Sequence, residues 1–252
     1  MSSEVISSSN KIIHTHYTDD GLNLDFYENF ISGDDAEAMM KYLEKTVTWA
    51  KPPSDYRRNN ATFGDDGLVY IVKVKDKEIR RPAMKWDPII LSIRERLMNL
   101  TKKYFNFGML LRYPSGKVGI TPHRDKEMVE GTTIAGISFG EIRYLNVERS
   151  QYNHINGTKK QKYVLKLTPG SLYCFNPPTN SYWLHSIDKD DTLGPRISLT
   201  FRTYDPSPFD MGIMIPRLLN LNLNTDSPSM PVQSENEEKK CKVNFVIVNP
   251  GE

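Results

Sequence analysis

Apolar residues between positions 23 and 104 recur with a helical period in two stretches. The first follows Ser32, a residue type that caps helix N-termini because its hydroxyl accepts a backbone N–H. The second follows Asp87 and Pro88, and proline suits the first turn of a helix because its missing N–H would have no partner there. Both stretches therefore predict amphipathic helices. The apolar stripes are Ala36, Met39, Met40, Leu43 and Val47 in the first helix, and Ile89, Ile93, Leu97 and Leu100 in the second.

After residue 104 the pattern changes to short strand-like runs separated by turn-forming residues such as Pro169-Gly170. About eight short strands in roughly 100 residues are typical of a sandwich or jelly roll rather than a parallel sheet. We therefore predict a mainly β fold of the α+β type with flanking N-terminal helices. The predicted strands are 107–113, 117–121, 133–139, 142–148, 163–167, 171–175, 182–187 and 196–204.

Composition shifts along the chain predict four regions. Residues 1–22 are polar and rich in serine, which indicates a flexible N-terminal tail. Residues 23–104 contain the two predicted helices, and residues 105–205 contain the predicted strands. Residues 206–252 include a polar stretch rich in proline and serine, and we interpret them as a C-terminal extension of unknown role.

Size and composition narrow the class of protein. A chain of 252 residues with 25% charged residues can bury one core, and a net charge of +2 is far from that of a strongly basic nucleic-acid coat. Two cysteines cannot form a disulfide framework, which favours a reducing compartment. No apolar run approaches the roughly 18 residues of a membrane span. We therefore expect a soluble intracellular protein without membrane contact, in either nucleus or cytoplasm.

Three residues form a candidate metal site. His123 and Asp125 lie in a turn between two predicted strands, and His185 lies near the end of another. Two imidazoles and one carboxylate are the ligand set of the facial triad, which leaves coordination positions open on non-heme Fe(II). A histidine alone is a weak signal, but this set is followed in the chain by two closely spaced arginines.

These arginines begin and end the predicted strand Arg196–Arg202. Because side chains alternate along a strand, Arg196 and Arg202 share one face with Ser198 and Thr200, and the apolar residues face the other way. Arginine binds carboxylates through a planar pair of N–H donors. A polar face with a guanidinium at each end suits a dicarboxylic acid, as an iron and 2-oxoglutarate dioxygenase requires.

The stretch from Phe105 to Tyr204 resembles the catalytic domain of the AlkB-type nucleic-acid dioxygenases, especially the eukaryotic DNA-repair branch. The segment Arg58–Tyr70 resembles the nucleotide-recognition lid of the same family. The resemblance implies a double-stranded β-helix, or jelly roll, with that lid and the flanking helices. The matching runs are Leu111–Tyr113, His123–Glu127, Ile137–Gly140, Pro169–Leu172, Thr179–Ser186 and Arg196–Arg202.

The resemblance also implies an activity and its cofactors. The family uses Fe(II), O₂ and 2-oxoglutarate to hydroxylate an N-alkyl group on a base such as 1-methyladenine or 3-methylcytosine, and the product then loses an aldehyde. DNA is the implied partner, with RNA as a further option, and we expect a monomer. By matching position, the iron ligands are His123, Asp125 and His185, and the cosubstrate-binding residues are Tyr113, Arg196, Ser198 and Arg202.

Substrate-binding residues follow from the same resemblance. Glu127 matches an acidic residue that reads the edge of the flipped base, and a carboxylate there favours a cationic alkylated base over a neutral one. Arg58, Phe63 and Tyr70 belong to the lid segment, where either aromatic residue is a candidate for stacking on the base.

Two departures from the family pattern bear on the cosubstrate. Leu111 and Ser198 replace asparagines that the family commonly has. Serine can still donate one hydrogen bond, whereas leucine cannot, so the sequence predicts weaker 2-oxoglutarate binding. Two alternatives stay open: a 2-oxoglutarate-dependent hydroxylase of a protein or small molecule, and a nucleic-acid-binding protein with weakened catalysis.

Overall fold

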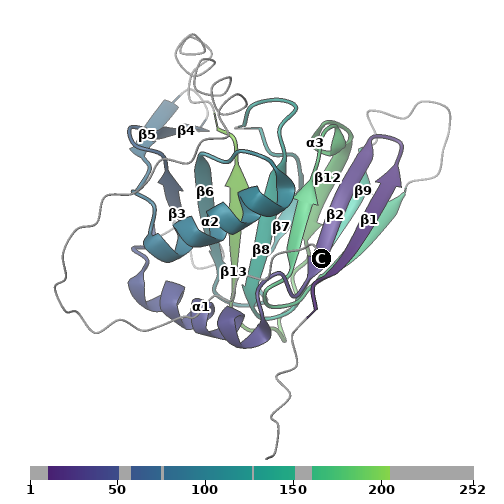
Figure 1. Cartoon of the computed structure of the whole chain (residues 1–252), viewed down its shortest axis with the longest axis horizontal. Coiled ribbons are helices and arrows are strands. Elements are labelled where there is room, and N and C mark those ends of the chain that lie inside the picture. The colour runs from purple at the N-terminus through teal and green to yellow at the C-terminus, as the bar shows by residue number, and fades with distance from the viewer. Residues whose placement is uncertain (1–10, 51–57, 75–76, 127, 151–160, 205–252) are drawn as a thin grey trace, which may run out of the picture. The chain divides into compact units, whose positions relative to one another are not determined.

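Two antiparallel β-sheets form the frame of the protein (Figure 1). The computed structural model describes residues 11–50, 58–74, 77–126, 128–150 and 161–204. The chain divides into two units after Tyr204, and every described residue belongs to the first unit. The mainly β, jelly-roll fold expected from the sequence is confirmed.

The larger sheet has seven strands and the smaller sheet has four. In spatial order, the larger sheet consists of β1 (Ile13–Asp19), β2 (Leu22–Glu28), β11 (Leu172–Phe175), β8 (Ile134–Gly140), β13 (Arg196–Arg202), β6 (Phe107–Tyr113) and β3 (Asn59–Gly64). The smaller sheet consists of β10 (Lys162–Leu167), β9 (Arg143–Arg149), β12 (Trp183–Ile187) and β7 (Ile120–His123). A separate hairpin pairs β4 (Val69–Val74) with β5 (Lys77–Pro82).

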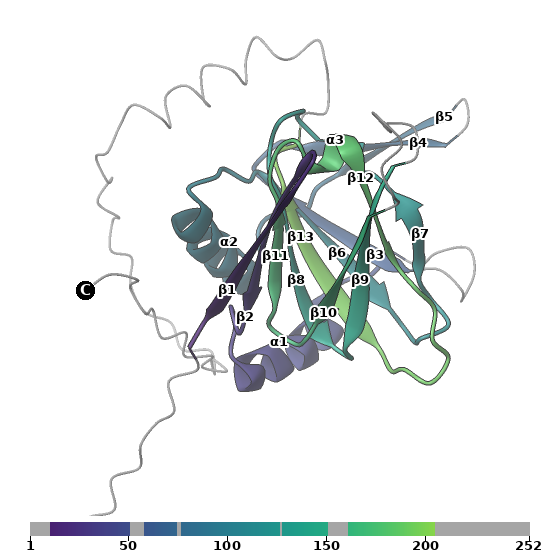
Figure 2. The ribbon, with the colours of Figure 1, turned by 90° about the vertical axis from the view of Figure 1, so that its right-hand side faces the viewer.

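Both predicted helices are present, with the predicted caps. The hydroxyl of Ser32 accepts a hydrogen bond from the backbone N–H of Asp35 before α1 (Gly33–Thr46). The Asp87 carboxylate accepts from the backbone of Ile89 and Ile90 before α2 (Pro88–Thr101). Figure 1 shows α1 and α2 on one face of the larger sheet, and Figure 2 shows the smaller sheet on its opposite side. A third, short helix, α3 (Thr179–Tyr182), precedes β12.

Apolar side chains fill the space on both sides of the larger sheet. One cluster packs α1 and α2 against outward-facing residues of β8 and β13, including Ile137, Phe139, Ile197, Leu199 and Phe201. The other lies between the sheets and includes Leu24, Phe26, Leu145, Val147, Phe175 and Trp183. The predicted alternation along β13 is therefore correct, because its apolar residues pack beneath the helices and its polar residues face the smaller sheet.

Part of the predicted N-terminal tail forms a strand. Within residues 1–22, Ile13–Asp19 form β1, which pairs along its whole length with β2. The strand escaped prediction because its side chains are largely exposed, so it is held by backbone hydrogen bonds rather than by an apolar face. Strands β2 and β3 also join the larger sheet, which extends it into the region 23–104 assigned to helices and lid. Residues 206–252 lie outside the described residues.

The interior of the larger sheet predicts a requirement for glycine at position 136. Gly136 is paired with Tyr173 on the neighbouring strand, and a Cβ at this position would overlap the Tyr173 ring. We expect Gly136→Ala to lower the free energy of unfolding by about 1–3 kcal/mol, as overpacking does in a dense core. Thermal and denaturant unfolding measure this change. Gly33→Ala is the control, because a Cβ there meets nothing within 4 Å. Equal stability of both variants would contradict the packing argument.

Candidate active site

The polar face of β13 lines a cavity between the two sheets. The cavity takes its walls from both sheets and from the loop after β7, so segments far apart in the chain meet in it. Its lining residues are Leu111, Tyr113, Ile120, His123, Asp125, Leu145, Tyr173, His185, Ile187, Arg196, Ser198, Thr200 and Arg202.

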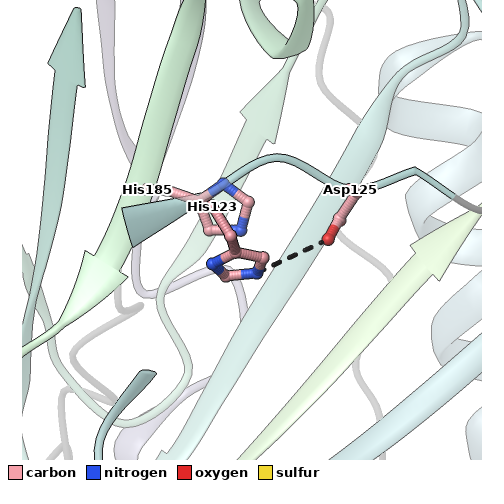
Figure 3. A group of neighbouring side chains, drawn as sticks. All are labelled: His123, Asp125 and His185. Atoms are coloured by element: carbon pink, nitrogen blue, oxygen red, sulfur yellow. Dashed lines mark ion pairs between the residues drawn. The ribbon is translucent and has the colours of Figure 1, made fainter. Parts of the chain in front are cut away.

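The three predicted metal ligands all line this cavity, and Figure 3 shows their side chains close together. Antiparallel pairing of β7 with β12 places His123 directly opposite His185, with ring centroids 4.2 Å apart. The Asp125 carboxylate Oδ1 lies 3.7 Å from His123 Nε2. One ligand atom from each residue lies within 4.8 Å of the others, which is a spacing that a single ion can bridge.

Each imidazole can offer a ring nitrogen to a metal ion. His123 Nδ1 lies 2.9 Å from the carbonyl oxygen of Thr121, which can only accept, so Nδ1 donates to that oxygen and Nε2 is the ring nitrogen left to face a metal ion. Burial lowers the pKa of His185 to about 4 and outweighs the negative charge of Asp125, which would raise it. His185 is therefore uncharged at neutral pH, as metal binding requires.

Asp125 supplies the single negative charge of the set. Its side chain is 6% exposed, and burial alone would raise the pKa of the carboxyl. The nearby charges of Arg202 and His185 outweigh burial and hold this pKa below its usual value. Arg202 contributes most among these charges, because its Nη2 lies 2.9 Å from Asp125 Oδ2. Two imidazoles and one ionised carboxylate fit a divalent iron ion.

Asn180 fixes the backbone of Asp125, a role that the sequence did not reveal. Its Oδ1 accepts from the Asp125 backbone N–H at 3.1 Å, and its Nδ2 donates to the Asp125 carbonyl oxygen at 2.7 Å. One side-chain amide thus satisfies both backbone groups of a metal ligand in a loop. The only sequence signal was the position of Asn180 shortly before His185, which by itself does not indicate a contact 55 residues away.

The remaining residues predicted to bind the cosubstrate line the same cavity as the metal ligands. Arg196 is 2% exposed, donates from Nε to Ser138 Oγ at 2.9 Å, and lies with Cζ 5.1 Å from the Tyr113 ring centroid. Its Nη1 and the Nε of Arg202 are buried without a hydrogen-bond partner among the described residues. Since buried N–H groups are normally paired, these donors fit an acid with two carboxylates. Ser198 and Leu111 line the same cavity.

The four predicted substrate-binding residues differ in where they lie. Arg58 lies beside the site, because its Cζ is 5.8 Å from the Tyr113 centroid and its charge acts on Asp125. Tyr70 stacks on Phe107 at 5.3 Å in a small cluster that also contacts Leu111 of the cavity wall. Glu127 lies outside the described residues.

Phe63 does not fit its proposed stacking role. Its side chain is 5% exposed and belongs to the cluster beneath the helices, where its ring stacks on Trp86 with centroids 6.5 Å apart. The alternation of β3 turns this residue away from the cavity, a consequence of sheet pairing that the lid resemblance did not convey.

Comparison with known proteins agrees with this geometry. The family model described as the 2OG-Fe(II) oxygenase superfamily matches residues 23–202, and the chain belongs to that superfamily. The DNA oxidative demethylase ALKBH2 of Bos taurus is 31% identical over 206 residues, which cover 75% of this chain and 71% of that protein. The Homo sapiens protein of the same name is 34% identical over 149 residues, covering 58% of this chain and 56% of its own length.

More distant relatives share the same fold family. The alpha-ketoglutarate-dependent dioxygenase alkB homolog 3 of Mus musculus is 25% identical over 194 residues, covering 72% of this chain and 66% of that protein. The solved structure of OsALKBH1 superposes with a TM-score of 0.52 at 14% identity, covering 74% of this chain and all of the other, which supports the fold. The family confirms the dioxygenase class and its use of Fe(II), 2-oxoglutarate and O₂.

Among the described residues, no helix is long and apolar enough to cross a membrane.

The contacts of Asn180 predict a role in metal affinity. Asn180→Ala removes both hydrogen bonds to the Asp125 backbone, and we expect Fe(II) binding to weaken roughly 10- to 100-fold, as for other residues that orient metal ligands. Anaerobic titration of Fe(II) measures the affinity. Ser181→Ala, at the exposed neighbouring position of α3, is the control and should bind iron as the wild type does. An unchanged affinity in Asn180→Ala would show that the Asp125 loop is held by other contacts.

Proposed function

We propose that this 2OG-Fe(II) oxygenase removes alkyl groups oxidatively from bases of DNA. The proposal is carried by one cavity that brings a two-histidine, one-carboxylate set together with buried arginine donors, in a chain similar to proteins named DNA oxidative demethylases. RNA is a second candidate substrate. We further propose a monomer. We also propose an intracellular location, since the buried thiol of Cys174 is free, as in a reducing compartment.

The proposed roles of the residues follow from their positions in the cavity. His123, Asp125 and His185 hold the iron. Arg196 and Tyr113 hold the carboxylate of 2-oxoglutarate that is far from the iron. Arg202 lies at the end of the cavity near the iron ligands. When bound, iron and 2-oxoglutarate use O₂ to hydroxylate a C–H bond, giving succinate and CO₂. A hydroxylated N-alkyl carbon then breaks its bond to the base nitrogen, which releases an aldehyde and the unmodified base.

Arg202 has a second proposed role. Its guanidinium lies against Asp125, and this contact keeps the carboxylate ionised and orients it toward the two imidazoles. Because the pair is nearly buried, little water competes for either charge. Arg202 therefore links the proposed metal site to the proposed cosubstrate site.

The substrate class is tested directly with an oligonucleotide that carries one 1-methyladenine. We expect the wild-type protein to restore adenine and to form one succinate per repaired base, with no turnover in His185→Ala. Succinate formation from another substrate without repair of DNA or RNA would favour a protein or small-molecule hydroxylase. Binding of the oligonucleotide without succinate would favour the weakened-enzyme alternative, which the presence of Leu111 and Ser198 in the cavity wall motivates.

We propose that Glu127 sets the preference for cationic lesions. Glu127→Gln should lower kcat/KM on 1-methyladenine and 3-methylcytosine by a factor about ten times larger than on a neutral alkylated base. The reason is that a charge pair at about 4 Å contributes on the order of 1–4 kcal/mol near a protein surface. Steady-state kinetics on both substrate kinds measure the difference. Glu130→Gln, an exposed residue of the same loop, is the control. An equal loss on both kinds of base would assign Glu127 to holding the loop.

A further inference from the structure

A third buried guanidinium lies on the inner face of the smaller sheet. Arg143 begins β9 and is 1% exposed. The next residue, Tyr144, is 53% exposed, and Leu145 lines the cavity. Because side chains alternate along a strand, Arg143 and Leu145 project from the same, inward face.

Strand pairing places Arg143 beyond Leu145, on the side of the cavity remote from the metal ligands and behind the residues that line it. On β9, Val147 is paired with the metal ligand His185, Leu145 is paired with Ile187 one step further along, and Arg143 follows. On β13, Arg202 contacts Asp125 and Arg196 lies at the opposite end of the strand. Both strands therefore run from an arginine at the remote end toward the metal end.

A direct contact joins Arg143 to the segment that precedes Arg196. Its Nη2 donates to the carbonyl oxygen of Gly194 at 3.1 Å, and the backbone N–H of Glu141 donates to Pro195 at 2.9 Å. The start of β9 and the start of β13 are thus tied together. Arg143 is close enough to Arg196 for the second charge to act on the first.

The hydrogen-bonding capacity of Arg143 is mostly unused. Its Nε and Nη1 are buried without a partner among the described residues, as is Nη1 of Arg196. Burial lowers the pKa of the Arg143 guanidinium, and the charge of Arg196 lowers it further, against a weaker opposing effect of Asp190 and Glu141. Two neighbouring buried cations with free N–H groups are costly unless an anion lies between them.

We infer that Arg143 is a third direct contact, with Arg196 and Tyr113, of the 2-oxoglutarate carboxylate that is remote from the metal. The chain thereby replaces the neutral amide donors missing at Leu111 and Ser198 with a full positive charge. The inference deepens the proposed function, since it rests on the proposed roles of Arg196 and Tyr113, but it does not depend on which nucleic acid is repaired. Its consequence is a strong preference for dicarboxylic over monocarboxylic 2-oxo acids.

Equilibrium binding of two ligands to the anaerobic Fe(II) protein tests this inference. 2-Oxoglutarate carries the remote carboxylate, and 2-oxopentanoate has the same carbon chain without it. We expect Arg143→Met to weaken 2-oxoglutarate roughly 10- to 100-fold, the range for loss of a charge-assisted hydrogen bond, and to leave 2-oxopentanoate within about twofold. Arg143→Lys, which keeps the charge without the fork, should show a smaller loss.

Arg149→Met is the matched control. Arg149 is also a buried arginine of β9, but its guanidinium is paired with Asp20. This variant should bind both ligands as the wild type does. Arg196→Met completes the set. If this variant binds both ligands as the wild type does, the proposed cosubstrate site is wrong. If Arg196→Met loses 2-oxoglutarate binding but the Arg143 variants do not, only the present inference is overturned.

An equal loss of both ligands in Arg143→Met, or no loss, would show that Arg143 only anchors the Gly194 segment. If the variants do not fold, the wild-type protein labelled with ¹⁵N-arginine decides the question. The Nε–H resonance of Arg143 should shift and become protected from exchange with water when 2-oxoglutarate is added, and should respond little to 2-oxopentanoate. An identical response to both ligands would overturn the inference.

Discussion

Positive charge buried between two sheets is the constraint on which the site depends. Arg196 and Arg202 are almost fully buried, as is Arg143, and among the residues that the structure describes the nearby carboxylate with comparable burial is Asp125, which is paired with Arg202. His185 adds no charge to this balance at neutral pH, because burial lowers its pKa to about 4. The interior is therefore electrostatically complete only with a bound anion, and a bound divalent metal ion increases that requirement. A dicarboxylic acid satisfies both ends of the cavity at once.

The fold can hold these charges because β13 separates two kinds of chemistry. Its apolar residues pack beneath α1 and α2, which contributes the burial that stabilises the central strand, while its polar residues are free to line the cavity. Pairing with β6 and β8 on either side keeps the strand from shifting by one residue, a shift that would exchange the two faces. The positions of Arg196 and Arg202 are thus set by the same register that builds the core.

The parts of the structure that could be predicted from the sequence are those with a local cause. The helix caps at Ser32 and Asp87 and the alternation along β13 follow from neighbouring residues, and the structure confirms them. Strand β1 could not be predicted, because backbone pairing with β2 leaves no apolar pattern. The contact of Asn180 with Asp125 depends on tertiary placement, and the inward position of Arg143 could not be told from an ordinary charged strand residue. Phe63 was misassigned for the same reason, since sheet pairing decides which way it faces.

The replacement of amides by charge changes what the cavity can recognise. An asparagine amide binds a carboxylate only at short range and in a fixed orientation, whereas a guanidinium attracts it over a longer distance. Attraction alone would accept many anions, so selectivity has to come from groups that fix the arginines. The Ser138 hydroxyl holds Nε of Arg196, and the Gly194 carbonyl holds Nη2 of Arg143, which leaves the remaining donors in defined directions. A cavity with leucine and serine at the amide positions can therefore keep its specificity, provided that the backbone around residue 194 keeps both guanidinium groups in place.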